Sequence, residues 1–174
     1  MQGTARRFLE GDRDARQVQL GDQVAHSLAD TLLTPMNDSF VDFDLLAHVD
    51  NDSEKILGPS VYSEMVWGAR QLRAQQGLRP IDWIVVRNRL GAQQMVNKMK
   101  MERALEQLSK RIGFRVAPGF SERVIFRELF PRGLTLLDLR DTGVDQLNLS
   151  NIAARQELRD LINELRLPGV SVSF

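Results

Sequence analysis

Cysteine is absent from this chain of 174 residues. A disulfide scaffold, a zinc site with Cys ligands and a thiol nucleophile are therefore excluded, and the composition is compatible with a reducing compartment. The two histidines, His26 and His48, are too few to build a zinc site alone. His48 stands near Asp44, Asp50 and Asp52. This pattern fits either a weak carboxylate-rich cation site or a polar loop, of which the loop is the commoner.

Long apolar runs are also missing. No stretch approaches the roughly 20 residues that a membrane helix needs, and the first seven residues hold no apolar segment typical of a signal peptide. We therefore expect a cytoplasmic protein with no membrane partner. With 43% hydrophobic and 26% charged residues, the chain is typical of one ordinary globular domain.

A phosphate-binding loop is the third absence. Such a loop needs glycines whose backbone N–H groups surround phosphate oxygens, followed by Lys and Ser or Thr. None of the 12 glycines in this chain is followed by Lys. No Ser/His/Asp arrangement has supporting context either, so simple motifs identify no enzyme.

Charge is unevenly distributed although the formal net charge is zero. Residues 1–54 carry four Lys or Arg against 11 Asp or Glu, a balance of −7, whereas residues 87–127 carry ten against three, a balance of +7. An acidic front and a basic middle predict a molecule with two electrostatic faces.

Apolar patterns predict an α/β fold with a mostly parallel sheet flanked by helices. Strands are predicted at residues 29–35, which end at a proline, at 82–88, and at 114–119, which lead into a loop. The β-branched run at 84–86 is typical of a strand covered on both faces. Helices are predicted from a stripe of Val61, Met65, Ala69 and Leu72 beginning near Pro59, from residues 101–112 ended by Gly113, from residues 122–130 capped by Ser121, and from residues 158–165.

Seven basic side chains form a candidate surface for DNA phosphates, whose binding would weaken steeply with salt. They are Lys98, Lys100, Arg103, Lys110, Arg111, Arg123 and Arg127. A solvated face is the alternative, with Glu102 and Glu106 supplying local pairs. Aromatic residues do not interleave these positions, so base stacking is not supported. Met95 and Met99 fit either packing against another element or a partner surface.

Four long segments resemble one protein family in the same order. They are ADTLLTPMNDSFVDFD from residue 29, DWIVVRNRL from residue 82, RIGFRVAPG from residue 111 and RVIFRELFPRGLTLLDL from residue 123, followed by the shorter AARQEL from residue 153. The chain resembles MipZ, the division-plane positioning ATPases of the ParA/MinD group of deviant P-loop proteins. The resemblance covers about residues 24–165.

The resemblance implies an ATP-dependent dimerisation switch that governs bacterial division-site placement and chromosome partitioning. Family members bind ATP and Mg²⁺, form homodimers around the nucleotide, bind DNA nonspecifically at the nucleoid, respond to a ParB-like centromere-binding protein and inhibit an FtsZ-like division protein. By the same resemblance, Asn88, Arg89, Pro118 and Gly119 stand where relatives contact adenine. An Asn amide offers both a donor and an acceptor to an adenine edge.

The family pattern also begins with a strand, a P-loop with two lysines and a switch segment, none of which is found in the first 28 residues. We therefore expect residues 1–28 to be a poorly ordered or rearranged leader, and 29–174 to match the C-terminal two-thirds of a ParA/MinD-like ATPase domain, an incomplete P-loop NTPase fold. For this chain alone we expect no bound cofactor, no ATP hydrolysis and marginal stability, because a missing central strand exposes unpaired backbone groups. A non-catalytic DNA- or protein-binding remnant of the family is the alternative.

Overall fold

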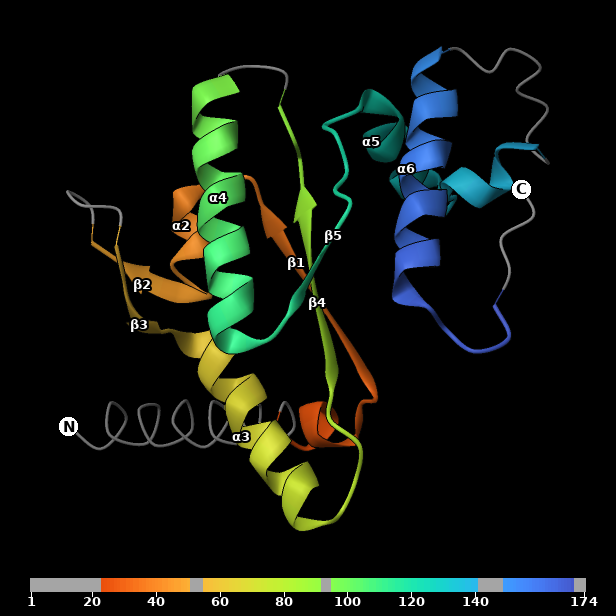
Figure 1. The fold of residues 1–174 in the computed structure, drawn as a ribbon. Coiled ribbons are helices and arrows are strands. Elements are labelled where there is room, and N and C mark those ends of the chain that lie inside the picture. Colours follow the sequence, from red (N-terminus) through yellow and green to blue (C-terminus); the bar gives the residue numbers. More distant parts are fainter. Residues whose placement is uncertain (1–22, 51–54, 92–94, 141–148, 171–174) are drawn as a thin grey trace, which may run out of the picture. The chain divides into compact units, whose positions relative to one another are not determined.

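The computed structural model describes residues 23–50, 55–91, 95–140 and 149–170, and of residues 40, 95–98, 139 and 140 only the backbone. The chain divides into two compact units, residues 1–32 with 45–82, and residues 33–44 with 83–174. The elements are β1 (Thr31–Asn37), α2 (Phe40–Phe43), β2 (Ala47–Val49), β3 (Ile56–Pro59), α3 (Val61–Gln75), β4 (Asp82–Asn88), α4 (Met95–Ile112), β5 (Arg115–Ala117), α5 (Val124–Leu129), η1 (Phe130–Arg132), η2 (Leu136–Arg140) and α6 (Leu149–Leu165) (Figure 1). The predicted leader at residues 1–28 lies outside the described residues except for a helical segment at 23–28.

A small parallel sheet with the order β1-β4-β5 organises the fold. Ile84 lies opposite Arg115 and Val86 opposite Ala117, and β1 runs in the same direction as β4 (Figure 1). The five inner residues of β4 are all buried. The α/β class and the strand at 82–88 are therefore confirmed, because a continuous β-branched run suits a strand covered on both sides.

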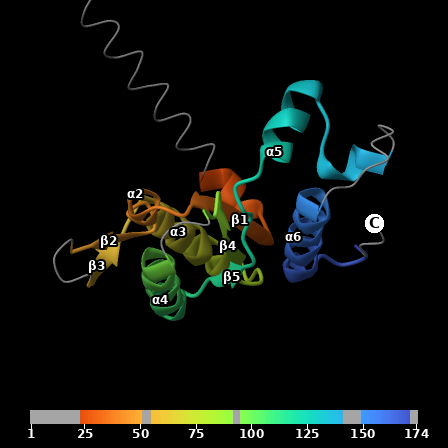
Figure 2. The same cartoon turned by 90° about the horizontal axis from the view of Figure 1, so that it is seen from above.

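Alternate residues of β4 serve two different faces. Ile84 and Val86 pack with Ala117 and with Leu161 of α6. Arg87 points the other way and reaches Glu102 of α4. Helices α4 and α6 thus cover opposite faces of the sheet (Figure 2), since neighbouring strand residues point to opposite sides.

Strand β1 differs from its prediction. It spans 31–37 and continues through Pro35 instead of ending there. Met36 is its single buried residue, and Leu33 is 39% exposed. Among the described strands β1 is an edge, where a residue without an N–H is tolerated because no neighbour requires that donor.

The unit that contains α3 includes a hairpin that the sequence interpretation missed. β2 and β3 pair antiparallel, with Ala47 opposite Pro59, so that His48 lies in a strand and the expected polar loop is wrong for this residue. Pro59 ends β3, and Ser60 is the N-cap of α3, which corrects the predicted helix start at Pro59.

The apolar stripe predicted for α3 is also wrong in part. Its buried residues are Ser63, Val66, Ala69 and Arg73, whereas Val61 is 54% and Leu72 44% exposed. Two of these buried side chains, Ser63 and Arg73, are polar, and hydrogen bonds satisfy them in the interior. The Ser63 hydroxyl, for example, donates to the Leu46 carbonyl.

Helices of the other unit begin at positions that the patterns did not predict. α4 begins at Met95 rather than 101, and its stripe of Met101, Leu105 and Leu108 is buried as expected. Gly113 follows it with a φ of 79°, the left-handed conformation predicted for a C-cap. α6 begins nine residues before the predicted 158. Of the two Met residues singled out, Met99 is 47% exposed.

Ser121 does not cap α5, which corrects another prediction. Arg123 occupies the N-cap position and makes no side-chain capping bond. Ser121 remains strand-like because it forms a bridge with Leu90, and its hydroxyl donates to Glu157 instead.

Candidate functional site

A cavity of about 640 Å³ lies on the α6 face of the sheet, towards the carboxyl end of β4, within the unit formed by residues 33–44 and 83–174. This volume is typical of a small-molecule site, and the carboxyl ends of parallel strands are the usual place for one. Its lining residues are Leu33, Pro35, Val86, Asn88, Arg89, Phe120, Ser121, Glu122, Arg123, Phe126, Arg127 and Leu161.

The walls of this cavity are mostly apolar. Leu33 and Pro35 come from β1, Val86 from β4 and Leu161 from α6, on the same face of the sheet. Phe120 and Phe126 meet edge to face, with ring centroids 5.7 Å apart and an interplanar angle of 84°. Such walls favour a flat apolar or aromatic group.

The polar part of the cavity begins where β4 ends. Asn88 is the last residue of β4, and Arg89 follows it with a φ of 56°, in the left-handed region that residues other than glycine rarely adopt. Strained backbone of this kind is characteristic of ligand-binding positions. Leu90 then resumes pairing, since its N–H donates to the Phe120 carbonyl at 2.9 Å.

The segment after β5 lies unusually close to this strand end. A Cβ on Gly119 would lie 2.6 Å from the Arg87 carbonyl oxygen and 2.8 Å from Leu90 Cδ1, so only glycine fits here. The Phe120 N–H donates to the Arg87 carbonyl at 2.9 Å. The cavity wall at 120–123 is therefore fixed directly against β4.

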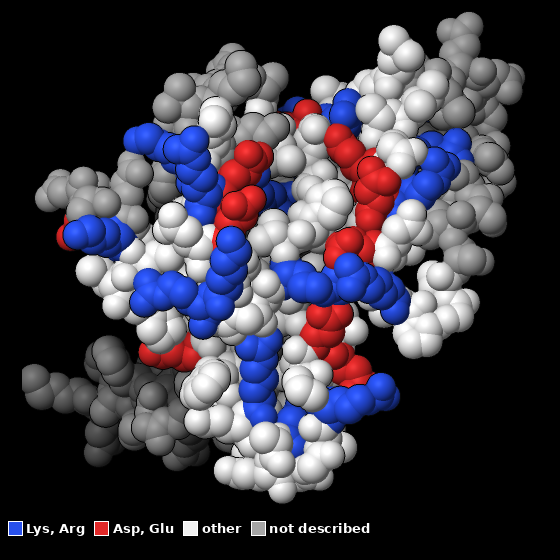
Figure 3. Space-filling model, in the orientation of Figure 1, with Lys and Arg blue, Asp and Glu red and all other residues white. Residues whose placement is uncertain are grey.

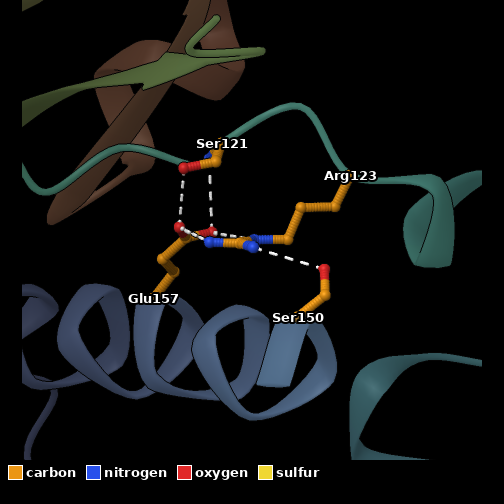
Figure 4. A network of polar contacts seen from close by, with 4 residues as sticks. All are labelled: Ser121, Arg123, Ser150 and Glu157. Carbon is orange, nitrogen blue, oxygen red and sulfur yellow. Dashed lines mark hydrogen bonds and ion pairs between the residues drawn. The ribbon is translucent and has the colours of Figure 1, made fainter. Parts of the chain in front are cut away.

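Glu157 of α6 fixes the same wall from the other side (Figure 4). Its carboxylate accepts from the Ser121 hydroxyl at 2.8 Å, from the Ser121 N–H at 3.2 Å and from Arg123 Nη2 at 2.7 Å. Arg123 Nη1 also donates to the Ser150 hydroxyl. Burial alone would raise the pKa of Glu157, but hydrogen bonds from Arg123 and Ser121 outweigh it and lower that pKa, while the bond to Glu157 raises the pKa of Arg123.

A family model for the ATPase MipZ matches residues 11–169 of this chain. The chain belongs to the MipZ family of ATPases. Membership in this family implies nucleotide binding. A comparison with curated proteins finds no match.

Of the four residues expected near adenine in the MipZ family, two line the cavity and two do not. Asn88 and Arg89 line the cavity. Pro118 and Gly119 precede its wall and are not among the lining residues, because Gly119 packs against β4. The cavity residue that follows them is Phe120, which the sequence reasoning missed. An aromatic residue one position after Pro-Gly was the signal that could have identified it.

The basic residues expected to bind DNA separate into two groups. Arg123 and Arg127 line the cavity, and Arg123 is neutralised by Glu157. On α4 four basic side chains are exposed, and Figure 3 shows Lys and Arg over this helix with acidic side chains between them. They are Lys100, Arg103, Lys110 and Arg111. The side chain of Lys98 lies outside the described residues.

The cavity combines apolar walls with polar and basic side chains. Its apolar walls and the Asn88 amide match a flat ring with hydrogen-bonding edges. In the described residues no group of three or more His, Asp or Glu side chains could hold a metal ion, and this applies to His48 with Asp44 and Asp50. Asp52, the other carboxylate near His48, lies outside the described residues. Within the same part of the chain, no helix is both long and apolar enough to span a bilayer.

Proposed function

We propose that this chain acts as a MipZ-like regulator of bacterial division-site placement and chromosome partitioning, and that it holds the adenine end of an ATP-dependent dimerisation switch. The observation that carries this is the cavity at the end of β4, where Asn88 and Arg89 meet apolar walls from β1, α5 and α6. Residues 29–174 would then correspond to the C-terminal part of a ParA/MinD-like ATPase domain.

The residues of the chain have distinct roles in this proposal. The Asn88 amide donates to and accepts from the edge of adenine, and the flat ring lies against Phe120 and the aliphatic wall. Arg89 and Arg127 supply positive charge at the same cavity. When bound, ATP supplies a γ-phosphate whose presence or loss shifts the population between monomer and dimer.

Selective binding tests the proposal. Although the sequence led us to expect no bound cofactor, the cavity supports binding of the base, so titration calorimetry should show that ATP binds more tightly than GTP. Asn88→Ala should weaken ATP binding about tenfold because one hydrogen-bonding group is lost. Asn163→Ala, exposed on α6 and outside the cavity, is the matched control. Equal binding of ATP and GTP, or an unchanged affinity in Asn88→Ala, would contradict the proposal.

We expect no ATP hydrolysis by this chain. None of its glycines is followed by Lys, so it holds no Gly-Lys loop to stabilise charge on a transferring phosphoryl group. The measurement is phosphate release from ATP and Mg²⁺ by a clean preparation, with heat-denatured protein as the control. Turnover above that background would mean that other residues contact the phosphates.

The exposed basic side chains of α4 favour a second candidate function, a non-catalytic binder of DNA. Lys100, Arg103, Lys110 and Arg111 would contact phosphates, so the affinity should fall with salt. Arg103→Gln should reduce the slope of log affinity against log salt by about one, whereas Arg166→Gln at the end of α6 should leave it unchanged. Binding that does not change with salt would exclude this account.

Partners are proposed on the family resemblance. They are a ParB-like centromere-binding protein, an FtsZ-like division protein and a second copy of the chain, in the cytoplasm at the nucleoid. Sedimentation of FtsZ-like polymers with and without the chain tests the division partner, and unchanged polymer mass would argue against it.

A further inference from the structure

Arg87 is a buried charge that the proposed nucleotide site does not itself use. It is 6% exposed and lies on the α4 face of β4, opposite the cavity. Its Nε and Nη2 donate to Asp38 Oδ1 at 3.0 and 2.6 Å, and its Nη1 donates to Glu102 Oε1 at 3.0 Å. One guanidinium therefore joins β4, the turn after β1 and helix α4.

The residue next to Arg87 is the one that faces the cavity. The Asn88 carbonyl accepts from the Asp38 N–H at 3.1 Å, and the Arg87 carbonyl accepts from the Phe120 N–H at 2.9 Å. Asp38 thus holds Arg87 through its carboxylate and Asn88 through its backbone. The bond from Asp38 therefore helps to fix the Asn88 backbone at the end of β4, just before the left-handed turn at Arg89.

We propose that Arg87, held between Asp38 and Glu102, is a positioning residue that sets the Asn88 amide for the base and ties its position to helix α4. This inference rests on the proposed function of the cavity and adds a residue outside it. The two carboxylates differ in burial. The side chain of Asp38 is 15% exposed and forms the inner end of the bridge, whereas that of Glu102 is 47% exposed and forms its outer end.

Glu102 is the better residue to change. Removing Arg87 would leave Asp38 as a buried charge without its partner and could unfold the protein. Glu102→Gln keeps the shape and leaves the bond between Arg87 and Asp38 intact. Glu106→Gln is the matched control, because Glu106 is exposed one helical turn further along α4.

A double-mutant cycle on ATP affinity tests the inference in the full chain. Glu102→Gln should weaken ATP binding about threefold to tenfold, and Glu106→Gln should not. In an Asn88→Ala background, Glu102→Gln should cause no further loss, because its effect acts through Asn88. Additive losses, or an unchanged affinity in Glu102→Gln, would overturn the positioning role while leaving the cavity proposal standing.

A spectroscopic measurement keeps the test independent of ligand binding. The side-chain amide signal of Asn88, assigned by its loss in Asn88→Ala, should shift in a ¹H–¹⁵N spectrum of Glu102→Gln and stay in place in Glu106→Gln. An Asn88 signal that is the same in both variants overturns the inference even in a sample that binds no nucleotide. If instead Asn88→Ala leaves ATP affinity unchanged, both the proposed function and this inference fail.

Discussion

Among the described residues, each of the two compact units buries one arginine, and the two are held by different partners. Arg73 of α3, 3% exposed, donates to the carbonyls of Arg79 and Ser27 at 2.8 and 3.0 Å and to Asp30, whose side chain is 83% exposed. Arg87 of β4, 6% exposed, donates instead to two carboxylates, of Asp38 and Glu102. The bonds of Arg73 to backbone carbonyls hold together nearby segments of its own unit. The bonds of Arg87 to two carboxylates connect β4, just before Asn88, to the turn after β1 and to α4. Burial alone therefore does not distinguish a structural arginine from one that serves a site.

The largest effect should come from removing the two arginines. Arg87→Met should lower the free energy of unfolding by about 3–5 kcal/mol, because the Asp38 carboxylate stays buried without a partner. Arg73→Met should lower it by about 1–3 kcal/mol, because it leaves carbonyls unsatisfied but strands no buried charge. Urea denaturation followed by circular dichroism measures both. Equal losses would show that the kind of partner does not matter.

The two units also differ in the space around one glycine of each, Gly119 and Gly68. Gly119→Ala should destabilise the protein by about 1–3 kcal/mol, because the added Cβ would lie 2.6 Å from the Arg87 carbonyl. Gly68→Ala on α3 should stabilise it by about 0.5–1 kcal/mol, since no atom lies within 4 Å of the new Cβ and alanine favours helix. Thermal melts of both variants check the opposite signs. A stabilising Gly119→Ala would refute the close approach of the cavity wall to β4.

The expected effect at Glu157 is modest and pH-dependent. Glu157→Gln should cost about 1–2 kcal/mol at pH 7, because Ser121 and Arg123 lose a charged acceptor. The pKa of Glu157 is lowered in the fold, so its contribution is present above the usual carboxylate pKa of about 4.3 and disappears as the pH falls through the lower folded pKa.

The difference in unfolding free energy between wild type and Glu157→Gln should therefore be largest near neutral pH and shrink below about pH 4. Gln156→Glu, an exposed neighbour on α6, serves as a control for added charge on the same helix. A difference that stays constant between pH 7 and pH 3 would contradict the role of the ionised carboxylate.

Much of the fold followed from local patterns. The β-branched run at 84–86 predicted a strand covered on both faces, and β4 is such a strand. The buried stripe of α4 and the left-handed Gly113 were equally predictable, because helical spacing and glycine at a C-cap are local rules. The hairpin of β2 and β3 escaped, since strands of three and four residues carry too little pattern.

Only the part of the candidate site at the end of β4 was predictable from the sequence. Resemblance directed attention to Asn88 and Arg89, which line the cavity. Charge pattern, however, assigned Arg123 and Arg127 to a DNA surface rather than to that cavity. Glu157 lies 34 residues after Arg123 and 36 after Ser121. No local rule connects carboxylates and partners at such separations.

The sequence by itself determined the α/β class, the covered strand, the MipZ-family segments and the absence of a Gly-Lys loop in these 174 residues, because each depends on residue type and short spacing. Only the tertiary structure decided that Arg87 pairs with Asp38 and Glu102 while Asn88 and Phe120 line the cavity, and that Glu157 holds the Ser121 and Arg123 wall. Contacts of this kind arise when the sheet and its two covering helices bring distant segments together, and the energy of a buried charge depends on the partners found at that point.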